Sequence, residues 1–385
     1  MEVLLDVTRL LRRRLRRWMP TGVDRVGLEY VRHYYNEARA LVRCAGRWIV
    51  LRRPESVRLF DALLDQQARL SALIPWCVAR GYAMDWTAPR TPCVLFNFDH
   101  SGLEGSSYAA RVRRYGLQPV FFLHDLIPVT HPEYCRPGQD VHHRRRVATM
   151  LQAGRGLVLN SHATRQSLEA YAAAGCLTVP PAVVAPLAPA RLPPAQTERP
   201  LDDPYFVVLG TIESRKNHLL LLHIWRSLVE RHGPRTPKLA VIGQRGWESE
   251  QALDLLDRCP ALRGVLVQRP ICDDAELANW LGHAQALLFP SFAEGYGLPI
   301  IEALMMRLPV VASDLPVFRE VGGGIPDYVD PLDGPGWTRT ILEYAQPDSP
   351  RSRSQRERMQ AYEPPTWQRH FDLVDLLVES VVDAA

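Results

Sequence analysis

The sequence predicts an α/β fold made of two doubly wound, Rossmann-like domains that face a central cleft. The chain has 385 residues, which is too long for one ordinary hydrophobic core. Strand and helix patterns alternate in each half, and a proline-rich linker at residues 186–204 separates the halves. We therefore expect an N-terminal Rossmann-like domain over 1–185 and a C-terminal Rossmann-like domain over 205–365. A terminal helix over 366–385 can return to the first domain.

The first half alternates short apolar runs with stretches of helical periodicity. Such runs indicate buried strands, and apolar residues at a spacing of about 3.6 indicate helices. The expected strands are 3–7, 48–51, 94–98, 120–123, 157–160 and 183–184. The expected helices are 23–37, 55–70, 103–115, 142–152 and 161–174. This order predicts a parallel sheet with helices on both faces.

The second half repeats the pattern after a segment, residues 180–204, that contains eight prolines and little periodicity. The expected strands are 205–209, 239–242, 265–267, 286–289 and 310–312. The expected helices are 218–231, 248–258, 274–283 and 299–306. In the terminal helix, the apolar residues Trp367, Phe371, Val374, Leu377 and Val381 recur at helical spacing.

Composition and charge narrow the class of protein. The net charge is +11 in residues 1–190 and −7 in residues 191–385, consistent with +4 overall. A basic half can serve a phosphorylated substrate or an anionic membrane surface. The seven cysteines are scattered, with no Cys-x-x-Cys pair, which favours a reducing compartment and no structural zinc. No apolar run is long enough to span a membrane, and acids occupy the start where a secretion signal has bases. We expect a soluble cytoplasmic protein.

Two glutamates eight positions apart, Glu294 and Glu302, flank a loop that contains two glycines. An apolar strand pattern at 286–289 precedes this loop, and a helix follows with Pro299 in its first turn. A strand, a loop and a helix N-terminus together offer free backbone N–H groups that suit a phosphate or a sugar hydroxyl. Each carboxylate can also accept hydrogen bonds from a vicinal diol. The pattern predicts a nucleotide-sugar site; the alternative is a structural turn whose acids favour the helix dipole.

A second motif follows the first strand of the C-terminal domain. Gly210 lets the backbone turn closely, and Arg215 and Lys216 come where the next helix begins. A guanidinium fork and an ammonium group beside a helix N-terminus suit a diphosphate. The alternative is a solvated pair, but two bases at a helix start are electrostatically unfavourable unless an anion is present.

The first half contains two further candidates. His124 comes at the carboxyl end of the strand pattern 120–123, where it can hydrogen-bond substrate hydroxyls or stabilise a leaving phosphate. Gly22 precedes the first long helix and can let the backbone approach a phosphate. The alternatives are a structural histidine and an ordinary turn glycine.

An arginine-rich segment near the start combines bases with leucines and one tryptophan. Near an anionic membrane surface each base contributes roughly 1 kcal/mol. The alternative is a solvated, arginine-rich loop or helix face. The candidate membrane or acceptor-side residues are Arg12, Arg13, Arg14, Arg16, Arg17 and Trp18.

Together, these motifs resemble those of the family-four retaining glycosyltransferases, which have the GT-B fold. The resemblance covers nearly the whole chain. It is strongest at residues 289–303, which match the family signature of two glutamates separated by seven residues. Three weaker matches occur in the family's order at 21–26, 124–128 and 210–217.

The resemblance implies roles for individual residues. Glu302 would bind the ribose hydroxyls, and Glu294 would hold the transferred sugar together with neighbouring backbone N–H groups. Arg215 and Lys216 would neutralise the diphosphate, and His124 would line the sugar side of the cleft. The implied catalytic residues are His124, Arg215, Lys216 and Glu294. The implied donor-binding residues, including two that bracket the base, are Gly22, Gly210, Pro270, Ile271, Tyr296, Gly297, Leu298 and Glu302.

The resemblance also implies a retaining transfer of a hexosyl unit from a nucleotide-diphosphate sugar to an acceptor hydroxyl. We expect no metal and no other cofactor, because no Asp-x-Asp motif lies near a candidate site and cationic side chains take the place of an ion. Family habit favours GDP-mannose or a GDP-deoxyhexose as donor, with UDP- or dTDP-sugars next. The expected acceptor is a lipid-linked oligosaccharide of a bacterial O-antigen, capsule or exopolysaccharide. The enzyme would act at the inner face of the inner membrane, and nucleic acid is not an expected partner.

Three other functions fit the same cleft. A sugar-nucleotide epimerase would consume the nucleotide sugar without an acceptor. A phosphorylase would need pyridoxal phosphate on a lysine, and Lys216 and Lys238 are the only lysines in the chain. A scaffold subunit would keep the fold without turnover, but the presence of both acids and both bases favours an enzyme.

Overall fold

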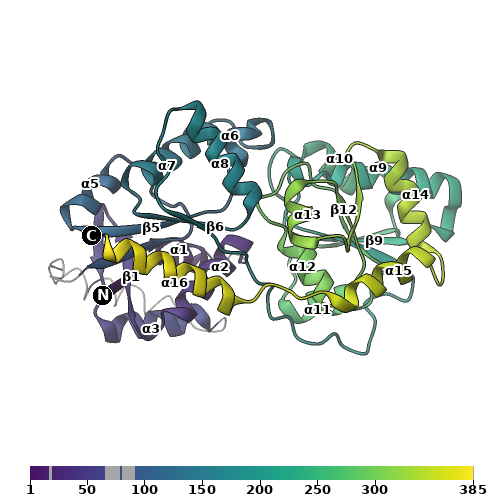
Figure 1. The fold of residues 1–385 in the computed structure, drawn as a ribbon. Helices are drawn as coiled ribbons and strands as arrows, with labels where there is room; N and C mark the ends of the chain where they lie inside the picture. Colours follow the sequence, from purple (N-terminus) through teal and green to yellow (C-terminus); the bar gives the residue numbers. More distant parts are fainter. Residues whose placement is uncertain (17–19, 66–78, 80–91, 385) are drawn as a thin grey trace. The chain divides into compact units, whose positions relative to one another are not determined.

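The computed structural model describes residues 1–16, 20–65, 79 and 92–384, which form two compact units (Figure 1). Unit 1 comprises Met1–Leu126, Val141–Leu187 and Pro365–Ala385, and unit 2 comprises Ile127–Asp140 and Ala188–Pro364. Each unit is a doubly wound α/β structure, which confirms the predicted fold class.

Unit 1 is built on a seven-stranded sheet in the order β3-β2-β1-β4-β5-β6-β7. Its strands are β1 (Glu2–Asp6), β2 (Ala38–Cys44), β3 (Arg47–Val50), β4 (Cys93–Asn97), β5 (Leu117–Leu123), β6 (Gly156–Leu159) and β7 (Ala182–Val184). The helices are α1 (Thr8–Leu15), α2 (Gly22–His33), α3 (Arg53–Leu64), α5 (Ser107–Arg114), α7 (Gln139–Ala153), α8 (His162–Ala174) and α16 (Trp367–Asp383). The first two residues of α7 belong to unit 2.

One edge of this sheet differs from the prediction. Strand β2 was not predicted, and β3 pairs antiparallel with it, so the sheet is not wholly parallel. Arginines interrupt the apolar residues of β2, so the sequence does not show a clear strand pattern there. The strand accommodates these arginines because their side chains make polar contacts. Arg39 donates to the Leu51 carbonyl at 2.8 Å and pairs with Glu2 at 2.8 Å. The predicted helix 55–70 corresponds to α3, and its last five residues lie outside the described ranges.

The terminal helix α16 packs against unit 1, as predicted, beside β5, β6 and β7 (Figure 1). Polar contacts fix it in place. His370 is fully buried, lies 3.1 Å from the Tyr30 hydroxyl through Nε2 and contacts the Ala185 carbonyl at 3.1 Å through Nδ1. The Phe371 ring stacks on that of His33 with centroids 3.9 Å apart. The last helix of the chain therefore completes the core of the first unit.

Unit 2 is built on a six-stranded, wholly parallel sheet in the order β10-β9-β8-β11-β12-β13. Its strands are β8 (Tyr205–Leu209), β9 (Lys238–Ile242), β10 (Leu266–Arg269), β11 (Leu287–Phe289), β12 (Val310–Ser313) and β13 (Asp327–Val329). The α-helices are α6 (Ile127–Thr130), α9 (His218–His232), α10 (Glu250–Arg258), α11 (Asp274–Gly282), α12 (Leu298–Met305), α13 (Pro316–Gly322), α14 (Gly334–Ala345) and α15 (Pro350–Arg358). Short 3₁₀ turns are η1 (Pro132–Tyr134), η2 (Ser214–Lys216), η3 (Gly233–Arg235), η4 (Pro260–Leu262) and η5 (Met359–Ala361).

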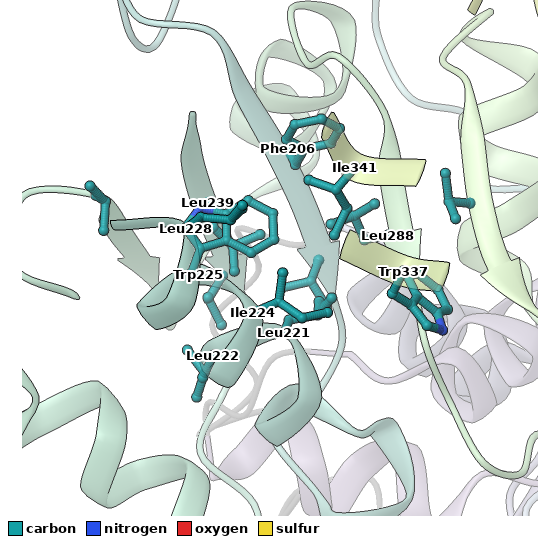
Figure 2. Close-up of a cluster of buried hydrophobic side chains, with 14 of the residues drawn as sticks. Phe206, Leu221, Leu222, Ile224, Trp225, Leu228, Leu239, Leu288, Trp337 and Ile341 are labelled. Atoms are coloured by element: carbon teal, nitrogen blue, oxygen red, sulfur yellow. The ribbon is translucent and has the colours of Figure 1, made fainter. Parts of the chain in front are cut away.

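The core of unit 2 gathers where α9 and α14 cover one face of the sheet (Figure 2). Trp225 and Trp337 are fully buried there. Each indole N–H keeps a partner, since Trp225 donates to the Pro237 carbonyl at 2.8 Å and Trp337 to the Asp330 carbonyl at 3.0 Å. Large aromatic area is thus buried without an unpaired donor. β13 and helices α13 to α15 were not predicted.

We expect Phe371→Ala to lower the free energy of unfolding by about 3–5 kcal/mol, because the ring is buried and its loss leaves a cavity. Urea denaturation of the full chain measures this change. Leu376→Ala on the same helix is the control, since that side chain is 61% exposed and should change stability little. Equal losses for the two variants would contradict the packing of α16 on unit 1.

Candidate active site

The strand order of unit 2 places its two principal sequence motifs together. The chain reverses its direction of sheet growth between β8 and β11, which are adjacent, with Leu287 opposite Val207. Open α/β sheets bind ligands at the carboxyl ends of the strands beside such a reversal. The loop after β8, residues 210–217, and the loop after β11, residues 290–297, both leave the sheet at this point. The fold therefore creates a candidate site between them.

The first loop is shaped by two residues with positive φ. Gly210 has φ +140°, a backbone conformation that residues with a side chain rarely adopt, so glycine permits the turn of the chain at this point. Asn217 has φ +56° and ends the η2 turn. Its amide donates to the Pro290 carbonyl at 3.2 Å and to the Pro331 carbonyl at 3.1 Å. Asn217 thus ties the first loop to the second.

The two loops meet at the carboxylate of Glu294. Arg215 Nη1 lies 2.7 Å from Glu294 Oε2, and Lys216 Nζ forms an ion pair with Oε1. Ser291 donates its hydroxyl to Oε1 at 2.9 Å. Arg215 also donates to the Ala293 carbonyl at 3.1 Å. The structure therefore brings three of the four predicted catalytic residues into one cluster.

The cluster is buried and electrically balanced. Burial acts to raise the pKa of Glu294, but Arg215 and Lys216 outweigh it and lower the pKa to about 2. Glu294 is therefore ionised at neutral pH and can only accept hydrogen bonds. Glu213, which sequence reasoning did not single out, adds a second carboxylate 3.1 Å from Arg215 Nε. Two bases at a helix start are electrostatically unfavourable unless an anion is near. Here the carboxylates of Glu294 and Glu213 supply that negative charge to Arg215 and Lys216.

The N-terminus of α12 adds donors to the same region. Gly297 is the N-cap with φ +117°, and a Cβ there would meet the Phe318 ring at 3.1 Å. In the part of the chain that the structure describes, the N–H groups of Gly297 and Leu298 donate no hydrogen bond to protein. Tyr296 is buried just before them, and Glu302 is buried in the next turn of α12. These are the positions that the sequence assigned to sugar and ribose.

In unit 1, His124 follows β5 as predicted and is buried. Its Nε2 lies 2.7 Å from the Phe98 carbonyl, which can only accept, so Nε2 carries the proton and Nδ1 is an acceptor. Burial lowers the pKa of His124 to about 4, so the ring is neutral at neutral pH. His100 Nε2 accepts the backbone N–H of His124 at 3.3 Å. Of the two predicted roles, this geometry suits accepting a hydrogen bond from a hydroxyl and does not suit donating one to a phosphate.

Gly22 is exposed and is the first residue of α2. The sequence predicted a glycine turn at the start of this helix. Its loop is held by Asp24, a buried carboxylate that sequence reasoning passed over. Asp24 accepts from the backbone N–H and the hydroxyl of Thr21, each at 2.7 Å. Arg9 and Arg13 pair with the same carboxylate at 3.1 and 2.6 Å.

The described part of the arginine-rich segment contains both paired and exposed arginines, and its membrane or acceptor-side role stays a prediction. It forms α1, in which Arg13 pairs with Asp24 and Arg14 donates to the Asp65 carbonyl at 2.6 Å. Arg12 and Arg16 are exposed. Arg17 and Trp18 lie outside the described residues. Among the described helices, none has the length and apolar character to cross a bilayer.

Pro270 and Ile271 follow β10, at the carboxyl edge of the unit 2 sheet. That strand is separated from β8 by β9, so the structure does not place these residues in the Glu294 cluster. Ile271 is 68% exposed. Their assignment to the nucleotide base remains a prediction.

Comparison with known proteins agrees with this geometry. Residues 203–344 match a family described as Glycosyl transferases group 1. The chain is 36% identical over 118 residues to the serotype-specific mannosyltransferase WbdA of Escherichia coli, a match covering 31% of this chain and 14% of that protein. It is 34% identical over 145 residues to the O-antigen chain mannosyltransferase B of Escherichia coli, covering 38% of each. The matched segments thus span well under half of these relatives.

Solved structures agree over the whole chain. Alr3699/HepE of Anabaena, determined with UDP and glucose, superposes with a TM-score of 0.68 at 14% identity, and both chains are covered completely. A sucrose-phosphate synthase from Thermosynechococcus elongatus gives a TM-score of 0.65 at 15% identity, again over all of both chains. These findings confirm the GT-B fold and the resemblance of the chain to bacterial polysaccharide glycosyltransferases.

The low pKa of Glu294 makes stability depend on pH. Because its folded pKa of about 2 lies below the ordinary value of 4.5, its ion pairs stabilise the fold above pH ~5 and are lost as pH falls toward 2. The stability advantage of the wild type over Glu294→Gln should shrink by about 2 kcal/mol between pH 7 and pH 3. Urea denaturation at several pH values measures it.

Asp257→Asn is the control for this experiment, because it breaks an exposed pair with Arg245. Its difference from the wild type should vary much less with pH. A difference between the wild type and Glu294→Gln that stays constant from pH 7 to pH 3 would contradict the buried cluster.

Proposed function

We propose that this chain, whose second unit carries a group 1 glycosyl transferase domain, is a retaining hexosyltransferase. It would transfer a glycosyl unit from a nucleotide-diphosphate sugar to a hydroxyl of a bacterial surface polysaccharide. The observation that supports this most is the buried cluster of Arg215, Lys216 and Glu294 at the reversal point of the unit 2 sheet. It combines two cations with an acceptor-only carboxylate, which are the groups that a sugar diphosphate needs.

Each end of the donor has a matching group. The diphosphate binds at Arg215 and Lys216, whose positions are already fixed by Glu294. Sugar hydroxyls donate to Glu294, and the N–H groups of Gly297 and Leu298 complete the pocket for the glycosyl unit. Glu302 accepts hydrogen bonds from the ribose. Because these groups are held in place before the donor arrives, little reorganisation accompanies binding.

The chemical step separates a sugar cation from an anion. As the glycosidic bond to phosphate breaks, positive charge develops on the sugar ring and negative charge on the diphosphate. Arg215 and Lys216 stabilise the departing diphosphate more strongly in this transition state than in the ground state. The acceptor hydroxyl attacks from the same face, and the leaving phosphate takes its proton. No protein nucleophile is involved, the reaction needs no metal, and neutral His124 accepts a hydrogen bond from a substrate hydroxyl.

The relatives favour one donor class. Both curated relatives quoted above are named as mannosyltransferases of Escherichia coli, which supports GDP-mannose or a GDP-deoxyhexose as donor and a lipid-linked O-antigen or similar glycan as acceptor. A UDP-sugar is the second candidate, because the Anabaena structure was determined with UDP and glucose. We place the reaction at the cytoplasmic face of the inner membrane, where lipid-linked acceptors are extended.

We expect Lys216→Ala to lower kcat by about 10²–10³-fold, since it removes one contact to the charge that develops on the diphosphate. Lys238→Ala is the matched control, because Lys238 is the only other lysine and pairs with Asp203 at 3.3 Å away from the cluster. Transfer from radiolabelled GDP-mannose to a lipid-linked acceptor measures both variants. Equal activity of Lys216→Ala and Lys238→Ala would exclude the proposed role.

The donor base is tested by thermal shift with GDP, UDP, dTDP and ADP, each with and without its sugar. A ligand that binds only the folded state raises the unfolding temperature with its concentration over Kd. We expect GDP-mannose to give the largest rise and Glu302→Gln to reduce the rise for every nucleotide. A rise in unfolding temperature with UDP-sugars alone would identify a UDP-sugar, and not GDP-mannose, as the donor. No rise with any nucleotide would refute the proposed glycosyltransferase function.

A further inference from the structure

The segment Ile127–Asp140, here called the excursion segment, leaves unit 1 after β5 and belongs structurally to unit 2. It is locally ordered by its own hydrogen bonds. The N–H groups of His131, Tyr134 and Cys135 donate to the carbonyls of Ile127, His131 and Pro132 at 2.8, 3.1 and 3.0 Å. None of the donor-binding roles described above is assigned to a residue of this segment.

The excursion segment contacts three loops of unit 2, and all three follow strands at the carboxyl edge of the sheet. After β8, the Ser214 hydroxyl donates to the Tyr134 carbonyl at 3.3 Å. After β9, the Arg136 guanidinium lies 4.8 Å from the centroid of the Trp247 ring. After β11, the Phe292 ring stacks on Tyr134 with centroids 5.4 Å apart and planes 6° from parallel. The segment therefore spans the edge at which the candidate active site lies.

Tyr134 is the centre of these contacts. Its ring stacks with that of His131, at 5.9 Å between centroids, and with that of Phe292, at 5.4 Å. The two unit 2 residues that contact Tyr134 in these loops are close in sequence to the ionic cluster. Ser214 precedes Arg215, and Phe292 lies two positions before Glu294. The Phe292 N–H also donates to the Arg215 carbonyl at 2.8 Å. One tyrosine thus holds both loops of the ionic cluster.

Resting on the proposed function, we propose that Tyr134 is a positioning residue for sugar transfer. By stacking on Phe292 and accepting from Ser214, it holds Glu294 at a fixed distance from the diphosphate-binding cations. Catalysis depends steeply on such distances, and a displacement of about 1 Å can cost on the order of 10²-fold in rate. The residues that precede and follow the excursion segment in the sequence belong to unit 1. The geometry of the donor site therefore depends on a segment that is far in sequence from the donor-binding motifs of unit 2.

The first test is hydrogen exchange of the full-length protein without ligand. We expect Tyr134→Ala to speed amide exchange in peptides covering 127–140 and 290–297, because the Phe292 N–H loses its protection. Tyr134→Phe keeps the ring and should exchange like the wild type. Glu133→Ala, an exposed change in the same segment, is the second control. Unchanged exchange at 290–297 in Tyr134→Ala overturns the proposal.

The second test is transfer kinetics with the same variants. Tyr134→Ala should lower kcat/KM for the donor about 10- to 100-fold, whereas Tyr134→Phe and Glu133→Ala should retain wild-type values. Faster exchange at 290–297 with wild-type kinetics also overturns the proposal. A wild type that turns over no nucleotide sugar refutes the proposed function instead, and the exchange experiment then decides separately whether Tyr134 holds the loop.

Discussion

The ion pairs of Glu294 with Arg215 and Lys216 are the interaction on which the rest of the site depends. A buried carboxylate is costly unless charges and hydrogen bonds compensate it, and here two cations and the Ser291 hydroxyl do so. Their meeting requires β8 and β11 to be neighbours, a glycine at 210 for the positive φ of the turn, and Asn217 to bind the second loop. The sheet topology and the local backbone thus serve one electrostatic arrangement.

This arrangement fixes what each group can do. In unit 2, Glu294 is ionised and can only accept hydrogen bonds; in unit 1, His124 is neutral with its remaining nitrogen as an acceptor. Positive charge in the candidate site comes from Arg215 and Lys216. A carboxylate that only accepts hydrogen bonds beside two cations agrees with the sugar diphosphate that we propose as ligand. It also explains why the reaction that we propose uses no acid or base from the protein.

Much of the fold and the main motifs could be predicted from the sequence. Apolar runs such as 205–209 and 286–289 are unbroken, so burial on both faces of a parallel sheet is visible in their composition. Strand β2 was missed because Arg39 and Arg43 interrupt its apolar residues, and their ion pairs with Glu2 and Asp6 depend on distant parts of the chain. The pairing of Arg13 with Asp24 is likewise a tertiary contact that the sequence pattern does not show. The excursion segment carries no periodic signal, and only the folded chain shows that it belongs to unit 2.

The most direct measurement of the central claim is a crystal structure of the protein with an intact nucleotide-diphosphate sugar. The account predicts that phosphate oxygens lie within hydrogen-bond distance of the Arg215 guanidinium and Lys216 Nζ, and that hydroxyls of the glycosyl unit donate to Glu294. A donor that is bound elsewhere, with no phosphate oxygen near either cation, would contradict it.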